Sequence, residues 1–319
     1  MKPPYEITST ILTQIASISE RIGEVNAVHL SKPPTELRKR NRIKTIQSSL
    51  EIEGNTLTIE QITDLLNNKR VIAPQKDIIE VKNAINVYDR LNEFNVYSLK
   101  SLCDAHKLLM VGLIDNAGKL RSTSVGIVKG EQLAHLAPPG EMVKPLMNDL
   151  FDYLKTDKDL LLIKSCVFHY EFEFIHPFLD GNGRMGRLWQ TLILKQYSPI
   201  FDFLPIETLV KEKQQEYYNV LGQSDMKGSS TDFIEFMLEI IKEALDDLLR
   251  TQNIILTNND RIEKYRDIIG VEEFSRLEYM RAFKNISSAT ASRDLKNAAD
   301  DGIIEKFGDK RTTKYRFRN

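Results

Sequence analysis

The chain has 319 residues, 41% of them hydrophobic, so it can bury a core in one large domain or in two to three smaller ones. Its 44 basic and 45 acidic side chains nearly balance, which excludes an overall attraction to nucleic acid or to a membrane surface. No apolar run approaches the ~20 residues that span a bilayer, and residues 1–20 lack the apolar core of a signal peptide, so we expect a cytoplasmic protein with no membrane partner.

The N-terminal part of the chain is predicted to be helical. The apolar residues of its first helix are three or four positions apart: Ile11, Ile15, Ile18 and Ile22. Further helices are predicted over residues 36–53, 58–66, 77–88 and 98–110. Gly54 is placed as a C-terminal cap, and Thr58 with Gln61 can form a capping box.

Ser49 and Glu53 lie four residues apart near the end of the second helix and therefore share a face. Taken alone, this pair predicts only an ordinary helix end with a solvated carboxylate.

Four side chains capable of chemistry fall inside predicted helices. His106 lies among leucines and His169 lies in an apolar segment, so both are interpreted as structural histidines. Cys103 and Cys166 also fall in apolar helical stretches, which predicts buried thiols in a reducing compartment.

Between residues 118 and 139 the pattern changes from helix to strand. Val125, Ile127 and Val128 precede a turn at residues 129–131 and a second apolar run at residues 133–136, which predicts a β-hairpin. An isolated hairpin exposes unpaired strand edges, so it either binds something or lies flat on the helices as a structural element.

Residues 176–187 read His-Pro-Phe-Leu-Asp-Gly-Asn-Gly-Arg-Met-Gly-Arg. Helices are predicted before this stretch, over residues 143–154 and 161–174, and after it, over residues 184–195. Gly181 and Gly183 let backbone N–H groups converge on an anion, and the N-terminus of the following helix adds its positive dipole end. The stretch is therefore predicted to be an anion cradle.

The side chains of this stretch suit phosphate chemistry. Neutral His176 can accept a proton near pH 7, and Asp180 suits Mg²⁺, which binds through one or two carboxylates plus substrate phosphates. Arg184 and Arg187 share a helix face and can bind phosphate oxygens. Together they predict phosphoryl or nucleotidyl transfer.

This stretch resembles the signature of Fic (filamentation induced by cAMP) proteins, H-x-F-x-[DE]-G-N-G-R-x-x-R, and fills every specified position. The resemblance implies a mainly α fold, a Fic-type helical bundle with a β-hairpin flap. It also implies a protein adenylyltransferase (AMPylator), which transfers AMP from ATP to a Ser, Thr or Tyr hydroxyl of a target protein or of the chain itself. Because the related Doc kinases carry Ala-Asn-Lys-Arg in place of Gly-Asn-Gly-Arg, nucleotidyl transfer is favoured over phosphorylation.

The resemblance implies a role for each matching residue. His176 would be the catalytic base, and Asp180 the Mg²⁺ ligand. The nucleotide-binding residues would be Gly181, Asn182, Gly183, Arg184 and Arg187.

Three further features take a role from the resemblance. Residues 49–54 match the family's inhibitory motif, [ST]-x-x-x-E-[GN], which implies that Glu53 pairs with Arg187 and makes this a self-inhibited member, or positions a water for removal of AMP. The hairpin, with Val125, Gly126, Ile127 and Val128, would be the flap that aligns a target segment as an added strand. Tyr218, in a helix predicted over residues 206–221, would line the adenine pocket.

The remaining chain is predicted to hold a loop at residues 201–205, a break at 224–231, a helix over 233–249 and a linker over 251–260. Two short helices over residues 271–283 and 288–301 then precede a hairpin, and this order resembles a winged helix-turn-helix, with residues 288–295 as the helix that would enter a groove. The predicted domains are residues 1–95 with the inhibitory helix, 96–250 as the catalytic core, and 251–319 as the winged-helix-like module. The oligomeric state, a homodimer included, stays open.

The C-terminal module carries a local basic patch that suits a phosphate backbone: Lys306, Lys310, Arg311, Lys314, Arg316 and Arg318. The alternative function is therefore a DNA-binding transcriptional regulator whose Fic domain senses nucleotide. Asp294, Asp300 and Asp301 on the presumed groove helix oppose this reading, and winged helices also serve as protein docking modules.

Overall fold

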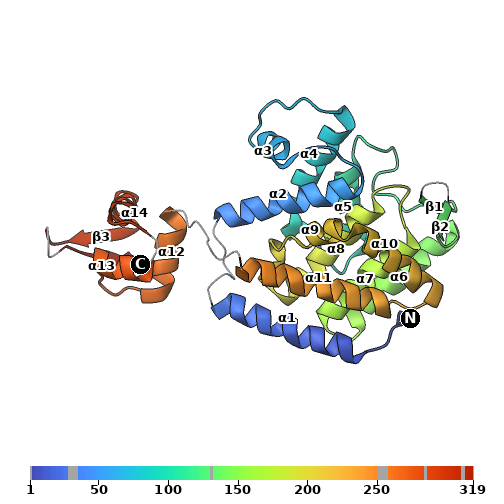
Figure 1. The fold of residues 1–319 in the computed structure, drawn as a ribbon. Coiled ribbons are helices and arrows are strands. Elements are labelled where there is room, and N and C mark those ends of the chain that lie inside the picture. Colours follow the sequence, from blue (N-terminus) through green and yellow to red (C-terminus); the bar gives the residue numbers. More distant parts are fainter. Residues whose placement is uncertain are drawn as a thin grey trace. The chain divides into compact units, whose positions relative to one another are not determined.

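The computed structural model describes residues 2–27, 35–129, 132–250, 258–283, 286–309 and 313–318 (Figure 1). The chain divides into two compact units. The larger comprises residues 1–32 and 40–252, and the smaller comprises residues 33–39 and 253–319. The predicted boundary at residue 95 falls inside the larger unit, and most of the predicted linker lies outside the described residues.

The larger unit is mainly helical. Its helices, with the start of the second belonging to the smaller unit, are α1 (Ser9–Ala27), α2 (Thr35–Ile52), α3 (Ile59–Leu66), α4 (Gln75–Asp89), α5 (Leu99–Met110), α6 (Gly140–Thr156), α7 (Leu161–Ile175), α8 (Asn182–Tyr197), α9 (Ile206–Glu212), α10 (Gln214–Lys227) and α11 (Thr231–Arg250). Short 3-10 helices lie at Leu91–Glu93 and Pro199–Asp202.

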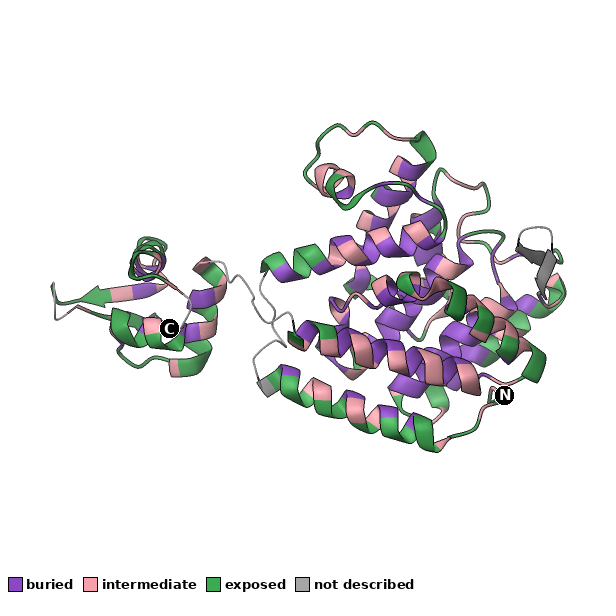
Figure 2. Ribbon diagram, viewed as in Figure 1, coloured by how far each residue is buried: buried purple, intermediate pink, exposed green. Residues whose placement is uncertain are grey.

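Helices α7 and α8 form the centre of the larger unit. Most of their residues are buried, because α6 and α11 pack on α7 and the two central helices pack on each other (Figure 2).

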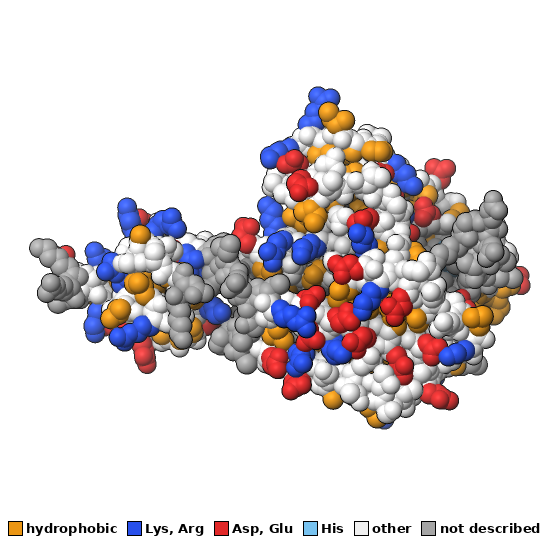
Figure 3. All heavy atoms as spheres, viewed as in Figure 1, with side chains coloured by type: hydrophobic (Ala, Val, Ile, Leu, Met, Phe, Trp, Pro, Cys, Tyr) orange, Lys and Arg blue, Asp and Glu red, His pale blue; other side chains and the backbone are white. Residues whose placement is uncertain are grey.

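On the surface, acidic and basic side chains are interspersed over the face seen in Figure 3, in keeping with the near-zero net charge. Within the described ranges, no helix is both long enough and apolar enough to cross a membrane.

The structure confirms most of the predicted helices but corrects the region after α8. The single helix predicted over residues 206–221 is wrong: α9 and α10 are separated at Lys213, whose φ of −104° and ψ of 29° interrupt the helix. The predicted break at residues 224–231 begins only at Gly228, and a 3-10 helix enters the predicted loop at 201–205. Polar residues alone do not end α10, whereas a left-handed glycine does.

The predicted β-hairpin is present. Strand β1 (Gly126–Lys129) pairs antiparallel with β2 (Gln132–Leu136), with an irregularity in register between Ile127 and Val128. Val125 precedes β1 rather than belonging to it, and residues 130–131 of the predicted turn lie outside the described residues.

The smaller unit contains α12 (Asn258–Ile269), α13 (Arg276–Ala282), α14 (Ser288–Asp300) and an antiparallel hairpin of β3 (Ile304–Phe307) and β4 (Lys314–Phe317). Its core is rich in aromatic rings: Tyr265, Phe274, Tyr279, Phe283 and Phe317. The sequence did not predict α12, because that helix is mostly polar and buries only Arg261, Ile262 and Tyr265.

Asp294 on α14 points into this core rather than to solvent. Its carboxylate accepts two hydrogen bonds from Arg261, at 2.5 and 2.9 Å, and one from the Tyr279 hydroxyl at 3.3 Å. Counting Asp294 against DNA binding was therefore wrong, since a buried and paired carboxylate does not repel a phosphate backbone at the surface.

Candidate active site

The loop between α7 and α8 holds a non-glycine residue in a left-handed conformation. His176 ends α7 with φ of 51° and ψ of 59°, and its N–H donates to the Phe172 carbonyl at 2.9 Å. Gly181, with φ of 82°, precedes α8. A left-handed non-glycine backbone costs about 1–3 kcal/mol, so the surrounding contacts must hold His176 in place.

Arg121 supplies such contacts. It is buried, and its guanidinium donates to four carbonyl oxygens, those of His176 at 2.7 Å, Ile175 at 2.9 Å, Thr123 at 2.7 Å and Pro138 at 2.8 Å. The first two belong to the end of α7, where a cation is favoured by the helix dipole. The last two flank the β1–β2 hairpin. One side chain therefore joins both ends of the hairpin to the backbone of His176.

His106 on α5 fixes the other side of the loop. Its Nδ1 accepts the Gly118 N–H at 2.8 Å, so the proton lies on Nε2, which donates to the Asp180 carbonyl at 2.9 Å. The ring stacks on Phe178 at 3.6 Å between centroids. Burial lowers the pKa of His106 to about 4, which keeps the ring neutral at pH 7. The prediction of a satisfied structural histidine is confirmed, and the structure adds that it supports this loop.

Asn182 closes the loop from within. Its side-chain oxygen accepts the Phe178 N–H and its amide nitrogen donates to the Phe178 carbonyl, both at 2.9 Å. The side chain is thus engaged inside the loop and links residue 178 to the first residue of α8. The first N–H groups of α8 have no partner within the helix, as at any helix N-terminus.

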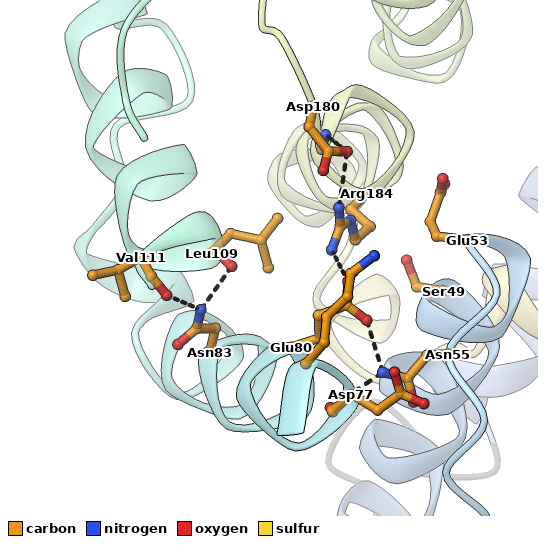
Figure 4. Close-up of polar contacts among 12 residues, drawn as sticks. Ser49, Glu53, Asn55, Asp77, Glu80, Asn83, Leu109, Val111, Asp180 and Arg184 are labelled. Carbon is orange, nitrogen blue, oxygen red and sulfur yellow. Dashed lines mark hydrogen bonds and ion pairs between the residues drawn. The ribbon is translucent and has the colours of Figure 1, made fainter. Parts of the chain in front are cut away.

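Arg184 and Asp180 form the outer part of the site (Figure 4). Arg184 Nη2 donates to Asp180 Oδ1 at 3.2 Å, and Nη1 donates to Glu80 Oε1, on α4, at 3.1 Å. The Asp180 side chain is 51% exposed, whereas those of Arg184 and Glu80 are each 5% exposed. The described residues contain no cluster of three or more His, Cys, Asp or Glu side chains suited to a metal. Asp180 accepts hydrogen bonds from Arg184 and from the Gly181 N–H, yet its half-exposed carboxylate fits a cation such as Mg²⁺, which takes its other ligands from water and phosphate.

The inner part of the site is formed by Arg187, Ser49 and Glu53. Arg187 Nε donates to the Ser49 hydroxyl at 3.1 Å, and Nη2 donates to the Ser49 carbonyl at 2.9 Å and to Glu53 Oε1 at 2.7 Å. Burial alone would lower the pKa of Arg187, but Glu53, together with Tyr217 and Glu173, outweighs burial and the pKa is raised. A Cβ added at Gly183 would lie 2.5 Å from Glu53 Oε1, so glycine makes room for this carboxylate over the N-terminus of α8.

The end of α2 explains why Glu53 reaches this position. Gly54, with φ of 90°, donates its N–H to the Glu51 carbonyl at 2.9 Å, and Asn55 donates to the Leu50 carbonyl at 3.1 Å. This is the Schellman pattern, and it confirms Gly54 as the C-terminal cap. Glu53 is the last residue before the left-handed turn, so the cap fixes the direction of its side chain.

Tyr218 is half-buried on α10, beside the wholly buried Tyr217. The Tyr217 hydroxyl bonds His169 Nε2 at 3.0 Å, and His169 Nδ1 bonds Gln190 at 2.7 Å. Burial lowers the pKa of His169 to about 3. His169 is therefore structural, as predicted, while the adenine contact assigned to Tyr218 stays a prediction.

The structure thus brings three of the predicted residues onto the two arginines of α8: Asp180 contacts Arg184, and Ser49 and Glu53 contact Arg187. Sequence reasoning missed Arg121 and Glu80. No local pattern marks either residue as part of the site, and the partners that matter, His176 for Arg121 and Arg184 for Glu80, lie 55 and 104 positions away, so only the fold reveals them.

Residues 96–194 match the model of the Fic/DOC family. A solved structure, that of a Fic family protein from Desulfovibrio desulfuricans G20, is 41% identical, covers 100% of this chain and 99% of that one, and superposes with a TM-score of 0.77. This chain belongs to the Fic family. Its larger unit therefore has the mainly helical Fic fold, and the loop described above carries the Fic signature.

More distant Fic relatives share only part of their length with this chain. The "Protein adenylyltransferase Fic" of Nematostella vectensis is 26% identical over 265 residues, which cover 78% of this chain and 59% of that protein. The "Protein adenylyltransferase fic-1" of Caenorhabditis elegans is 25% identical over 264 residues, covering 78% and 48%. This Fic chain thus spans about half the length of such relatives.

Proposed function

We propose that this Fic protein is a protein adenylyltransferase that transfers AMP from ATP to a hydroxyl of a target protein and is self-inhibited by Glu53. The observation that carries the proposal is the carboxylate of Glu53 held on Arg187 over the N-terminus of α8. A negative group is bound there by a guanidinium and faces the first turn of a helix, which is the environment that a phosphate prefers. The names of the Nematostella and Caenorhabditis relatives support the same reaction.

The proposed reaction uses the loop and the start of α8. His176 accepts the proton of the target hydroxyl while the oxygen of that hydroxyl bonds to the α-phosphorus of ATP. The bond from that phosphorus to the bridging oxygen breaks, and pyrophosphate leaves. Arg184, Arg187 and the N–H groups of α8 take up the negative charge of the phosphates. Asp180 would hold Mg²⁺, which when bound neutralises charge on the phosphate oxygens.

The target is proposed to bind along the β1–β2 hairpin. In a two-stranded sheet each strand pairs on one side only, so an outer edge remains for a segment of the target. The matching flap residues are Val125, Gly126, Ile127 and Val128, with Val125 as the entry to the strand.

The position of a label in ATP tests the reaction. With Glu53→Gly, Mg²⁺ and ATP labelled at the α-phosphate, we expect label on the chain itself or on protein from a cell extract. ATP labelled at the γ-phosphate should give none, because the γ-phosphate leaves with pyrophosphate. Label from the γ-phosphate alone would identify a kinase instead. Loss of AMP from labelled protein on adding the parent chain, but not Glu53→Gly, would support de-AMPylation.

A second proposed function, DNA binding, is favoured by the order of elements in the smaller unit and by the burial of Asp294. We infer that α14 and the β3–β4 hairpin form a winged helix-turn-helix. Two acidic residues offset part of the positive charge on this surface. Glu305 pairs with Arg316 at 3.7 Å and with Arg318 at 3.1 Å, and Glu273 pairs with Lys314 at 3.6 Å.

Salt dependence tests this second function. We expect the full chain to bind duplex DNA with an affinity that falls as salt rises, with a log–log slope of about −0.9 for each phosphate contact. Lys314→Ala should reduce the slope by about one, whereas Lys100→Ala, on the larger unit, should leave it unchanged. A duplex affinity that does not vary with salt, or no binding, would favour a protein docking module.

A further inference from the structure

The turn that carries Glu53 and the first turn of α8 share one buried carboxylate, that of Glu80 on α4 (Figure 4). Glu80 Oε2 accepts a hydrogen bond from the Asn55 amide nitrogen at 2.8 Å, and Oε1 accepts one from Arg184 Nη1 at 3.1 Å. Glu80 is 4% exposed, Asn55 6% and Arg184 5%. The two oxygens of one side chain therefore serve two different segments of the site.

Both ends of the Asn55 amide group are hydrogen-bonded to the backbone. Its amide nitrogen also donates to the Asp77 carbonyl at 3.1 Å, and its oxygen accepts the Leu57 N–H at 3.1 Å. The same turn is held by Asp77, whose carboxylate accepts the Thr56 N–H at 3.0 Å and hydroxyl at 2.6 Å. The first turn of α4 thus anchors the residues that directly follow Glu53.

Arg184 has two carboxylate partners that differ in burial. Its bond to Asp180 runs to a half-exposed side chain, whereas its bond to Glu80 runs to a buried one, where charge-assisted hydrogen bonds are stronger. Asp180 Oδ1 also accepts the Gly181 N–H at 2.6 Å, so Arg184 shares this oxygen with the backbone, and a cation bound by the same carboxylate would further weaken its hold on the guanidinium. Glu80 would then be the carboxylate that keeps the guanidinium beside the N-terminus of α8.

We propose that Glu80 is a positioning residue for the nucleotide site, which orients Arg184 toward the phosphates and ties it to the turn that carries Glu53. The inference rests on the proposed function. It assigns to Glu80 no contact with substrate, so its effect must pass through Arg184. Removing Glu80 should therefore weaken binding of nucleotides that reach Arg184 with their outer phosphates and spare those that do not.

Calorimetric titration of the full chain with ATP and with AMP, both with Mg²⁺, tests this. In the Glu53→Gly background, Glu80→Gln should weaken ATP binding by about tenfold, the loss of one charge-assisted hydrogen bond, and change AMP binding by less than about twofold. Asp77→Asn is the matched control, because Asp77 lies one turn before Glu80, is also buried and holds the same turn without a bond to Arg184. It should leave the ratio of ATP to AMP affinity unchanged.

A selective loss of ATP affinity supports the proposal. Equal losses for ATP and AMP, no loss for either, or the same change in Asp77→Asn would overturn it while leaving the proposed function intact. If Glu80→Gln does not fold, as its thermal melt would show, Glu80→Asp replaces it; this keeps the charge one methylene short of Arg184 and should reduce ATP affinity selectively but less. Failure of Glu53→Gly itself to bind ATP would overturn the proposed function together with the inference.

Discussion

His176→Ala, introduced together with Glu53→Gly, is expected to lower the rate of AMP transfer by roughly 10²- to 10⁴-fold, the usual contribution of a general base. The proton of the target hydroxyl would then have no acceptor at the α7–α8 loop. ATP should still bind, because the residues proposed to contact its phosphates lie on α8 and do not include the imidazole. The measurement is the initial rate of incorporation of α-labelled AMP, with ATP affinity measured alongside.

Added imidazole provides the control for this variant. If His176 acts as a base, the cavity left by alanine should admit imidazole and part of the rate should return. A His176→Ala chain that transfers AMP as fast as its parent would contradict the assignment. A chain that loses ATP binding as well would point to collapse of the loop, although the bond from Arg121 to the backbone carbonyl of residue 176 is one that alanine can keep.

Glu53→Gly alone is expected to raise AMP transfer by about 10- to 100-fold. The substitution removes a charge-assisted hydrogen bond to a buried guanidinium, worth about 1.5–3 kcal/mol, and each 1.4 kcal/mol is tenfold in a binding equilibrium. The carboxylate also repels the phosphates that must reach Arg187. Initial rates of labelling by the parent and the variant measure the effect.

Two further substitutions separate charge from backbone effects. Glu53→Gln keeps the size of the side chain and should also raise the rate, though less, because an amide still accepts one hydrogen bond from Arg187. Glu51→Gln is the matched control: Glu51 lies on the same turn of α2 but pairs with Lys211 at 2.9 Å, away from Arg187, and should leave the rate unchanged. Equal rates for parent and Glu53→Gly would refute self-inhibition through this residue.

Local signals accounted for much of the fold and for the signature loop. The capping box at Thr58, the left-handed glycine after Glu53 and the hairpin near Val128 each depend on a few consecutive residues, so the sequence reveals them. Residues 206–221 also look like one continuous helix, yet the helix is interrupted at Lys213, and the two pieces on either side of it each pack on α11. Tertiary contacts override such local propensity.

The support of the site could not be predicted in the same way. The supporting side chains form hydrogen bonds to residues far away in the chain, as Arg121, His106 and Glu80 show. No spacing in the sequence indicates which residues will be their partners. The pairing of Glu53 with Arg187 was inferred because the resemblance named both positions. In the structure the same two residues lie 2.7 Å apart between Oε1 and Nη2.

The four carbonyls held by Arg121 bear on how this protein would discriminate among targets. Since the residues that flank the hairpin and the backbone of the proposed base are bonded to one guanidinium, a target peptide that shifts the hairpin would also shift the backbone of His176. A poorly matched target would then bind and yet react slowly. The difference between good and poor targets would therefore lie in kcat as much as in KM.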